Sequence, residues 1–373
     1  MLRRTARSLS LALLVWAVAR PAEAGAQRCS APRTALVLSG GGAKGVAHIG
    51  ALRVLDSLGI HPDLVVGTSM GAVVGALYAS GYSGRELDSL TRIVPISALF
   101  RSYQPLAPRS LGILQPLVAW EQGERRFALQ SASVDEAAAS ALVNSAMLRG
   151  NLLARGDFDS LPIPFRAVAT DLADRRTVVM RSGDLAQAVR ASAAVPLLFA
   201  PEYRDGRYLT DGGLSANVPV RVARAEGAER VIVVDATEHL SDTVESESPL
   251  LVADRLVQFL FHQPAAPLGP EDVLIRPAVD GFASLNFAPR RLERLLELGA
   301  SAADSVLEPP VCPVPPARPA PALPSYISGI DFGGANASER LALRRLLGLG
   351  SRDTLDVELL RKRLRNLATA SDA

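Results

Sequence analysis

The stretch PDLVVGTSMG, residues 62–71, decides the fold of this 373-residue chain. Its first half ends in a continuous apolar run, which is typical of a strand buried on both faces of a parallel sheet. A segment of small residues follows from Met70 to Ser80, and Gly81 supplies the end expected of a helix. A strand that passes directly into a helix is the repeating unit of α/β proteins.

The chain repeats this alternation on both sides of that stretch. Residues 34–39, TALVLS, predict a buried strand, and apolar residues at helical spacing predict a helix over residues 43–58. Further strands are expected at residues 165–170, 177–180 and 230–235, with helices around residues 184–193 and 218–225. We therefore expect an α/β fold with a central, mostly parallel sheet, and the 48% hydrophobic composition suffices for a large core.

The turn between strand and helix is the sharpest local motif in the sequence. Small residues two positions before and after Ser69 let the strand and helix backbones pass closely. This pattern predicts a nucleophile elbow, which raises the serine hydroxyl above the sheet edge. The first N–H groups of the following helix favour negative charge at the same place. Ser69 is therefore the candidate nucleophile, and the elbow comprises Gly67, Thr68, Met70 and Gly71.

A second glycine-rich turn occupies the preceding strand end, and it consists of Gly40, Gly41, Gly42, Ala43, Lys44 and Gly45. Unobstructed backbone N–H groups in one concavity can bind an oxyanion or a phosphate. A phosphate loop would place serine or threonine after the lysine, and a dinucleotide site would place an acidic residue at the end of the second strand. Gly45 follows Lys44 and Asp63 precedes that strand, so we expect an oxyanion hole.

A nucleophilic serine needs a base, and histidine is the usual one. The sequence contains four histidines, at His48, His61, His239 and His262. None lies in a surrounding that marks it as catalytic, since His48 falls inside the first expected helix and His61 precedes a strand. A conventional triad that uses His239 or His262 remains one alternative.

An acidic turn offers a different partner for the serine. Asp211 follows a short Tyr-Leu-Thr segment, and Gly212 and Gly213 leave space around its carboxylate. By itself the pattern is also that of an ordinary Asp-Gly turn. Together with the serine elbow and the glycine loop, it makes Asp211 the candidate base for Ser69.

These segments, in this order, resemble the patatin-like phospholipases. Residues 191–201, ASAAVPLLFAP, resemble the segment that precedes the aspartate in that family, and Arg190 occupies its basic position. The similarity spans residues 34–307. It implies a three-layer variant of the α/β hydrolase fold, a Ser69/Asp211 dyad, an oxyanion hole at the glycine loop and no cofactor. The implied activity is acyl ester hydrolysis on membrane phospholipid or another lipid ester, of the phospholipase A or lysophospholipase type.

The N-terminus predicts export. Three arginines precede an apolar run over residues 9–19, which is too short to span a bilayer, and small residues follow it. We expect a signal peptide over residues 1–26, cleaved after Ala24 or Ala26, and a periplasmic, outer-membrane-associated or secreted protein. The residues before Cys29 are not those of a lipid-modified cysteine. The 40 basic and 38 acidic residues balance, which disfavours nucleic-acid binding.

The two cysteines, Cys29 and Cys312, leave two alternatives open. Export would place them in an oxidising compartment, where a disulfide could form, but spacing alone does not show that they approach each other. Two buried thiols are the other alternative. Neither the cysteines nor the histidines cluster as in a metal site, and no calcium-loop spacing is present.

The C-terminal part is organised differently. Prolines crowd residues 308–324 and predict an extended linker, after which a strand over residues 325–332 and two helices, 338–347 and 354–370, are expected. Residues 325–373 resemble the first half of a POTRA module, which implies a small α+β segment and association with the outer membrane. A fragment, a truncated product, or a helical tail on the hydrolase would each account for the missing second half.

Two further expectations concern the whole chain. Residues 99–159 have an irregular helical pattern that suits an insertion or cap over the site. The alternative from another functional class is an exported binding or secretion module without catalytic activity, which the intact serine, aspartate and glycine loop disfavour.

Overall fold

The computed structural model describes residues 32–93, 118–121, 126–129, 136–196, 198–238, 255, 258–264, 266–309, 322–323, 325–326, 336–348 and 354–370. The expected signal peptide, Cys29, Cys312 and His239 lie outside these residues, as does most of the proline-rich linker. In the described part of the chain no helix has the length and apolarity needed to cross a bilayer.

Within the described residues, eight strands form one sheet in the order β10-β9-β1-β2-β5-β8-β7, with β6 also paired to β5. The strands are β1 (Thr34–Leu38), β2 (Leu64–Thr68), β5 (Phe165–Asp171), β6 (Thr177–Met180), β7 (Glu202–Arg204), β8 (Arg207–Asp211), β9 (Arg230–Val234) and β10 (Val273–Ile275). The five strands from β10 to β5 run parallel, whereas β6, β7 and β8 are antiparallel to their neighbours. The expected mostly parallel sheet is confirmed.

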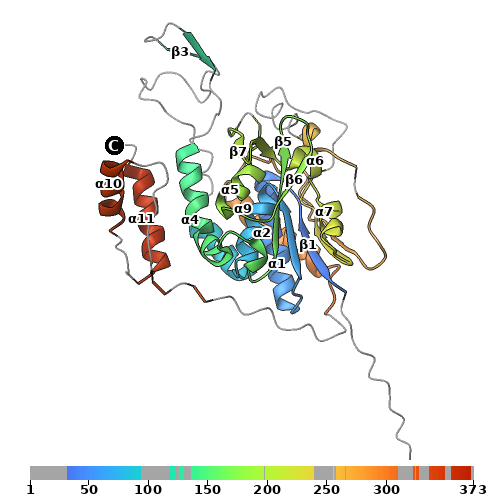
Figure 1. The fold of residues 1–373 in the computed structure, drawn as a ribbon. Coiled ribbons are helices and arrows are strands. Elements are labelled where there is room, and N and C mark those ends of the chain that lie inside the picture. The colour runs from blue at the N-terminus through green and yellow to red at the C-terminus, as the bar shows by residue number, and fades with distance from the viewer. Residues whose placement is uncertain are drawn as a thin grey trace, which may run out of the picture. The chain divides into compact units, whose positions relative to one another are not determined.

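Helices cover both faces of this sheet (Figure 1). The helices of the described residues are η1 (Gly42–Val46), α1 (Ala47–Ser57), α2 (Met70–Ala79), α3 (Gly84–Ile93), α4 (Glu136–Ala154), η3 (Phe158–Ser160), α5 (Leu185–Ser192), α6 (Gly213–Ala216), α7 (Val220–Ala225), α9 (Pro289–Asp304), α10 (Ala337–Leu347) and α11 (Val357–Ala370). A separate antiparallel pair joins β3 (Val118–Glu121) to β4 (Arg126–Leu129).

Alternate residues of the central strands divide between two cores. Leu36 and Leu38 of β1 pack with α1, α2 and α9, whereas Ala35 and Val37 pack with α7 on the opposite face. Because side chains alternate across a strand, a strand buried on both faces must be apolar at every position. This explains why β1 and β2 appear in the sequence as continuous apolar runs and establishes a three-layer arrangement.

The first expected helix begins differently from its prediction. Residues 42–46 form a 3-10 turn, and the α-helix starts only at Ala47. Gly42 has a φ of 56°, outside the right-handed helical region, and the Ala43 N–H donates to Ser284 O at 2.7 Å. These tertiary constraints hold the glycine loop in a shape that helical periodicity alone does not predict.

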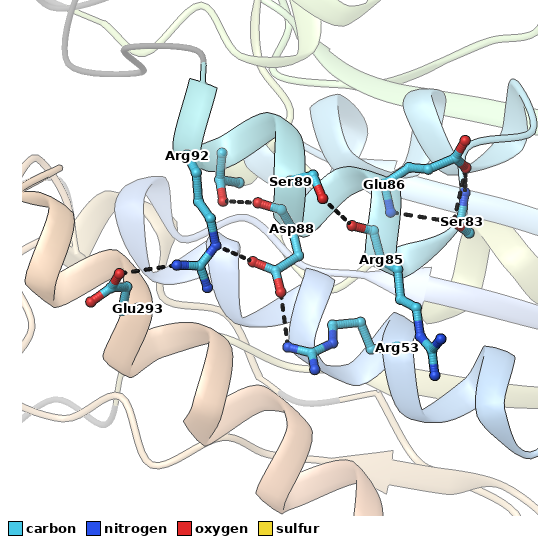
Figure 2. A network of polar contacts seen from close by, with 9 residues as sticks. Arg53, Ser83, Arg85, Glu86, Asp88, Ser89, Arg92 and Glu293 are labelled. Carbon is cyan, nitrogen blue, oxygen red and sulfur yellow. Dashed lines mark hydrogen bonds and ion pairs between the residues drawn. The ribbon is translucent and has the colours of Figure 1, made fainter.

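Helix α3 is tied to its neighbours by the charged network in Figure 2. Asp88 accepts from Arg53 of α1 at 3.0 Å and from Arg92 at 3.2 Å, and Arg92 reaches Glu293 of α9 at 3.1 Å. Arg53, Arg92 and Glu293 are exposed, so each pair contributes at most about 1 kcal/mol to stability. The network orients α3 more than it stabilises the fold.

The C-terminal helices α10 and α11 are present as expected. Arg361 of α11 donates to Ser145 O of α4 at 3.1 Å and to the Tyr82 hydroxyl at 2.9 Å. Tyr326 forms an isolated bridge with Thr354, and the rest of the expected strand, residues 327–332, lies outside the described residues. The resemblance to a POTRA module and the domain boundaries remain predictions.

Helices α1 and α9 approach each other at glycines. A Cβ on Gly299 would lie 1.9 Å from Ala47 O, and one on Gly50 would lie 2.0 Å from Leu296 O. We predict that Gly299→Ala lowers the free energy of unfolding by about 1–3 kcal/mol, because the backbones must separate. Urea unfolding of the purified protein measures this loss. Ser301→Ala, at an exposed position of the same helix, is the control and should change stability by less than about 0.5 kcal/mol.

Candidate active site

The turn between β2 and α2 holds Ser69 in a strained backbone conformation. Its φ of 54° and ψ of −123° lie in a region that non-glycine residues rarely adopt. A Cβ on Gly67 would lie 2.4 Å from Gly71 O, and one on Gly71 would lie 2.3 Å from Leu38 O. Only glycine fits at either position, which explains the spacing of the motif.

The Ser69 hydroxyl meets Asp211. The distance between Ser69 Oγ and Asp211 Oδ2 is 2.6 Å, and the second carboxylate oxygen accepts the Gly213 N–H at 2.7 Å. Asp211 ends β8, which pairs with β5, and β5 in turn pairs with β2. The two residues are thus brought together across the sheet, with Ser69 4% exposed and Asp211 fully buried.

Burial changes the acidity of the aspartate. Loss of water around the carboxylate raises the pKa of Asp211 to about 7, while hydrogen bonds from Ser69 and Gly213 act in the opposite direction. A carboxyl group of this pKa can exchange a proton near neutral pH, as a general base must.

Residues 191–201 connect the serine turn to the aspartate. Ser192 is fully buried, accepts the Ser69 N–H at 3.0 Å and donates to Val168 O. The Asp211 N–H donates to Ala194 O at 3.0 Å, two residues farther along the same segment. The sequence of this segment does not predict a role for Ser192, because the hydrogen-bond partners of its hydroxyl, Ser69 and Val168, are remote in the chain.

The glycine loop presents two N–H groups beside Ser69. The Gly40 N–H donates to Asn217 O at 3.1 Å and the Ala43 N–H to Ser284 O, whereas the N–H groups of Gly41 and Gly42 have no acceptor among the described residues. Gly41 and Gly42 border the cavity at Ser69. Of the six loop residues expected to form an oxyanion hole, Gly41 and Gly42 therefore combine a backbone N–H group without an acceptor among the described residues with a position at the cavity.

Lys44 lies in the loop but has another partner. Its side chain is 2% exposed, and Nζ forms an ion pair with Glu238 Oε2 at 2.9 Å. A buried lysine needs such a partner because an isolated charge is costly to desolvate. The sequence placed Lys44 with the oxyanion loop, but the pairing with a residue 194 positions away was not predictable from it.

Of the three histidines that the structure describes, His48, His61 and His262, none is hydrogen-bonded to Ser69 Oγ. His48 is buried, its Nε2–H donates to Ser39 O at 2.8 Å, and burial lowers its pKa to about 4. It therefore supports the strand end before the glycine loop as a neutral ring. His262 lines a cavity near Ser69, and among the described residues the hydrogen-bond partner of Ser69 Oγ is Asp211.

Two cavities meet at Ser69, with volumes of about 520 Å³ and 120 Å³. Gly42, Val195 and Leu285 border both of them. Among the described residues, no group of three or more histidine, cysteine, aspartate or glutamate side chains is placed to hold a metal ion. Ser69 lies where the two cavities meet, and its hydroxyl is hydrogen-bonded to the Asp211 carboxylate.

The fold and site define an α/β protein with a serine and a buried carboxylate at the edge of its sheet. The patatin-like phospholipase family model matches residues 36–224, and the chain belongs to this family. The matched segment contains the glycine loop, the serine turn and the Asp-Gly-Gly turn.

Individual relatives match less than the whole chain. An uncharacterized NTE family protein of Mycobacterium tuberculosis is 31% identical over 237 residues, which cover 63% of this chain and 58% of that protein. Human patatin-like phospholipase domain-containing protein 6 is 31% identical over 205 residues, 54% of this chain and 13% of that protein. The chain thus spans just over half of the mycobacterial relative and a small part of the human one.

Two solved structures are also similar. VipD from Legionella pneumophila aligns with a TM-score of 0.45 and 16% identity, over 74% of this chain and 67% of that one. ExoU from Pseudomonas aeruginosa, in complex with SpcU, aligns with a TM-score of 0.33 and 20% identity, over 74% and 52%.

The raised pKa of Asp211 makes the free energy of unfolding depend on pH. Because the pKa is raised on folding, the contribution of Asp211 to stability is full below its unfolded pKa of about 4 and is lost as pH rises through 7. The loss amounts to roughly 4 kcal/mol at most. We therefore predict that Asp211→Asn stabilises the protein by about 2–4 kcal/mol at pH 8 and much less at pH 5.

Denaturant unfolding of both proteins at the two pH values measures this difference. His48 also makes stability depend on pH, because its lowered pKa reduces stability as pH falls. This contribution is the same in the variant and the wild type, so it drops out of the difference between them. An equal effect of Asp211→Asn at pH 5 and pH 8 would contradict a raised pKa.

Proposed function

We propose that this protein hydrolyses acyl esters of lipids, as a phospholipase A or lysophospholipase, with Ser69 as nucleophile and Asp211 as base. The observation that carries the proposal is the 2.6 Å contact between Ser69 Oγ and Asp211 Oδ2 at the junction of two cavities. Family membership supports lipid ester hydrolysis. The assignment of individual residues rests on the geometry.

The proposed first half-reaction forms an acyl-enzyme. Ser69 Oγ attacks the ester carbonyl while Asp211 accepts the hydroxyl proton, and the N–H groups of Gly41 and Gly42 stabilise the oxyanion. The tetrahedral intermediate then collapses with cleavage of the bond to the alcohol oxygen. Asp211 returns the proton to that oxygen, so the alcohol leaves as a neutral molecule.

The second half-reaction releases the acid. Asp211 accepts a proton from a water molecule, whose oxygen attacks the acyl carbon and forms a second oxyanion at the same amides. Collapse of this intermediate breaks the bond to Ser69 Oγ, and the proton on Asp211 passes to the serine oxygen. The free enzyme is regenerated, and the net reaction consumes one water.

Export is part of the proposal. It rests on the arginines and apolar run at the N-terminus, which lie outside the described residues, and on the resemblance of residues 325–373 to a POTRA module. An exported enzyme would meet its lipid substrate at the periplasmic or outer face of a membrane, and its C-terminal segment would associate with the outer membrane.

The dyad is tested by replacing its members. We expect Ser69→Ala and Asp211→Asn each to lower kcat/KM for fatty acid release by at least about 10³-fold, since both remove groups used in the transition state. His262→Gln and His239→Gln are the controls and should retain activity. Activity is measured on phospholipid and lysophospholipid vesicles with purified full-length protein. Loss of activity in a histidine variant, or its retention in the Ser69 variant, would refute the dyad.

The rate should also depend on pH in a defined direction. Asp211 accepts a proton only when ionised, and its pKa is raised to about 7. We expect kcat/KM to be constant above pH 8 and to fall about tenfold per pH unit well below pH 7. A pH profile on a soluble ester, whose own ionisation does not interfere, measures this. A profile that is flat down to pH 5 would contradict a base whose pKa is raised to about 7.

A further inference from the structure

The two cavities at Ser69 differ in chemistry. The smaller one is lined mainly by apolar side chains, among them Met70, Val73, Val143, Val189, Phe199 and Leu285, but Ser140 and the ion pair of Arg190 and Glu202 also border it. These come largely from α2, α4 and α5, the helices on one face of the sheet. The larger one contains four charged side chains: Lys44, Asp235, Glu238 and Arg276. An ester bound at Ser69 therefore has a smaller, more apolar space on one side and a larger, more polar space on the other.

The charges of the larger cavity are paired. Lys44 Nζ lies 2.9 Å from Glu238 Oε2, and Arg276 Nη2 lies 2.9 Å from Asp235 Oδ2. Each pair has no net charge but retains polar groups at the cavity wall. Such a wall suits an uncharged or zwitterionic polar group, which can exchange hydrogen bonds with it, better than a hydrocarbon chain, which cannot.

The size of the apolar cavity limits what it holds. Its volume of about 120 Å³ is slightly less than the roughly 150 Å³ of an apolar protein cavity that accommodates benzene, a molecule of six carbons. By that comparison it encloses about four to six methylene groups. A longer chain must extend beyond the cavity, and its additional methylenes gain less from burial.

We propose that the acyl group of the substrate enters the smaller cavity and its polar alcohol occupies the larger one, so that the enzyme prefers acyl chains of about four to six carbons. This inference rests on the proposed function. The reverse orientation would place a hydrocarbon chain against two ion pairs. It would also place a polar alcohol in the smaller cavity, where Ser140 and one ion pair offer fewer partners for its hydroxyl groups than the larger cavity does.

The chain length is tested with p-nitrophenyl esters of two to sixteen carbons, in which the alcohol is constant. We expect kcat/KM to be highest at four to six carbons and at least about tenfold lower at twelve, because the cavity no longer encloses the added carbons. A maximum at twelve carbons or more would overturn the inference while leaving ester hydrolysis, and hence the proposed function, intact. No Ser69-dependent hydrolysis of any ester would instead overturn the proposed function itself.

Variants on the walls of the two cavities show which cavity holds the acyl chain. Val143→Phe narrows the smaller one and should shift the optimum toward two carbons, whereas Val143→Ala widens it and should shift the optimum upward. Val218→Phe, in the larger cavity, is the matched control. It should leave the chain-length optimum unchanged and lower kcat/KM for butyrate esters of large alcohols.

The two Val143 variants keep the test valid if one of them fails to fold. If Val143→Phe does not fold, as thermal unfolding would reveal, Val143→Ala still tests the same wall by the opposite shift. A change of the chain-length optimum in Val218→Phe, with none in either Val143 variant, would assign the acyl chain to the larger cavity and overturn the inference.

Discussion

The hydrogen bond between Ser69 Oγ and Asp211 Oδ2 is the contact on which the rest of the site depends. Its partners are separated by 142 residues and come from different strands of one sheet. A contact of 2.6 Å over that separation requires β2, β5 and β8 to keep a fixed register. The sheet core beneath them, buried on both faces, supplies that rigidity.

Two features of the site are energetically unfavourable, and the surrounding structure must stabilise them. Ser69 has a strained backbone, and Asp211 is a carboxylate buried away from water. Ser192 connects the two residues. Its hydroxyl accepts the Ser69 N–H, and the backbone carbonyls of Ser192 and Ala194 accept the N–H groups of Gly212 and Asp211. In most of a protein the local sequence preferences agree with the fold. Departures from that agreement, such as a strained backbone or a buried charge, are typical of functional sites.

Much of the sheet was predictable because its central strands obey a simple rule. The buried runs of β1, β2 and β9 are almost entirely apolar, as burial on both faces requires, and each ends near a glycine-rich or polar turn. The short antiparallel strand β7 gave no such signal, since its three residues are not fully buried. The site was predicted in part: glycine spacing identified the serine turn and the loop, but nothing local revealed the Lys44–Glu238 pair or the bonding of Ser192.

The sequence by itself determined the conformations that short-range sterics control. Gly67 and Gly71 permit the turn that carries Ser69, and the consecutive glycines from Gly40 to Gly42 permit a loop with exposed amides. Only the tertiary structure decided that Asp211 meets Ser69, which of the loop amides lack an acceptor among the described residues, and that two cavities of different size and polarity meet at the hydroxyl. Those outcomes depend on strand order and packing, and no local pattern encodes the distance between residues that are remote in the chain.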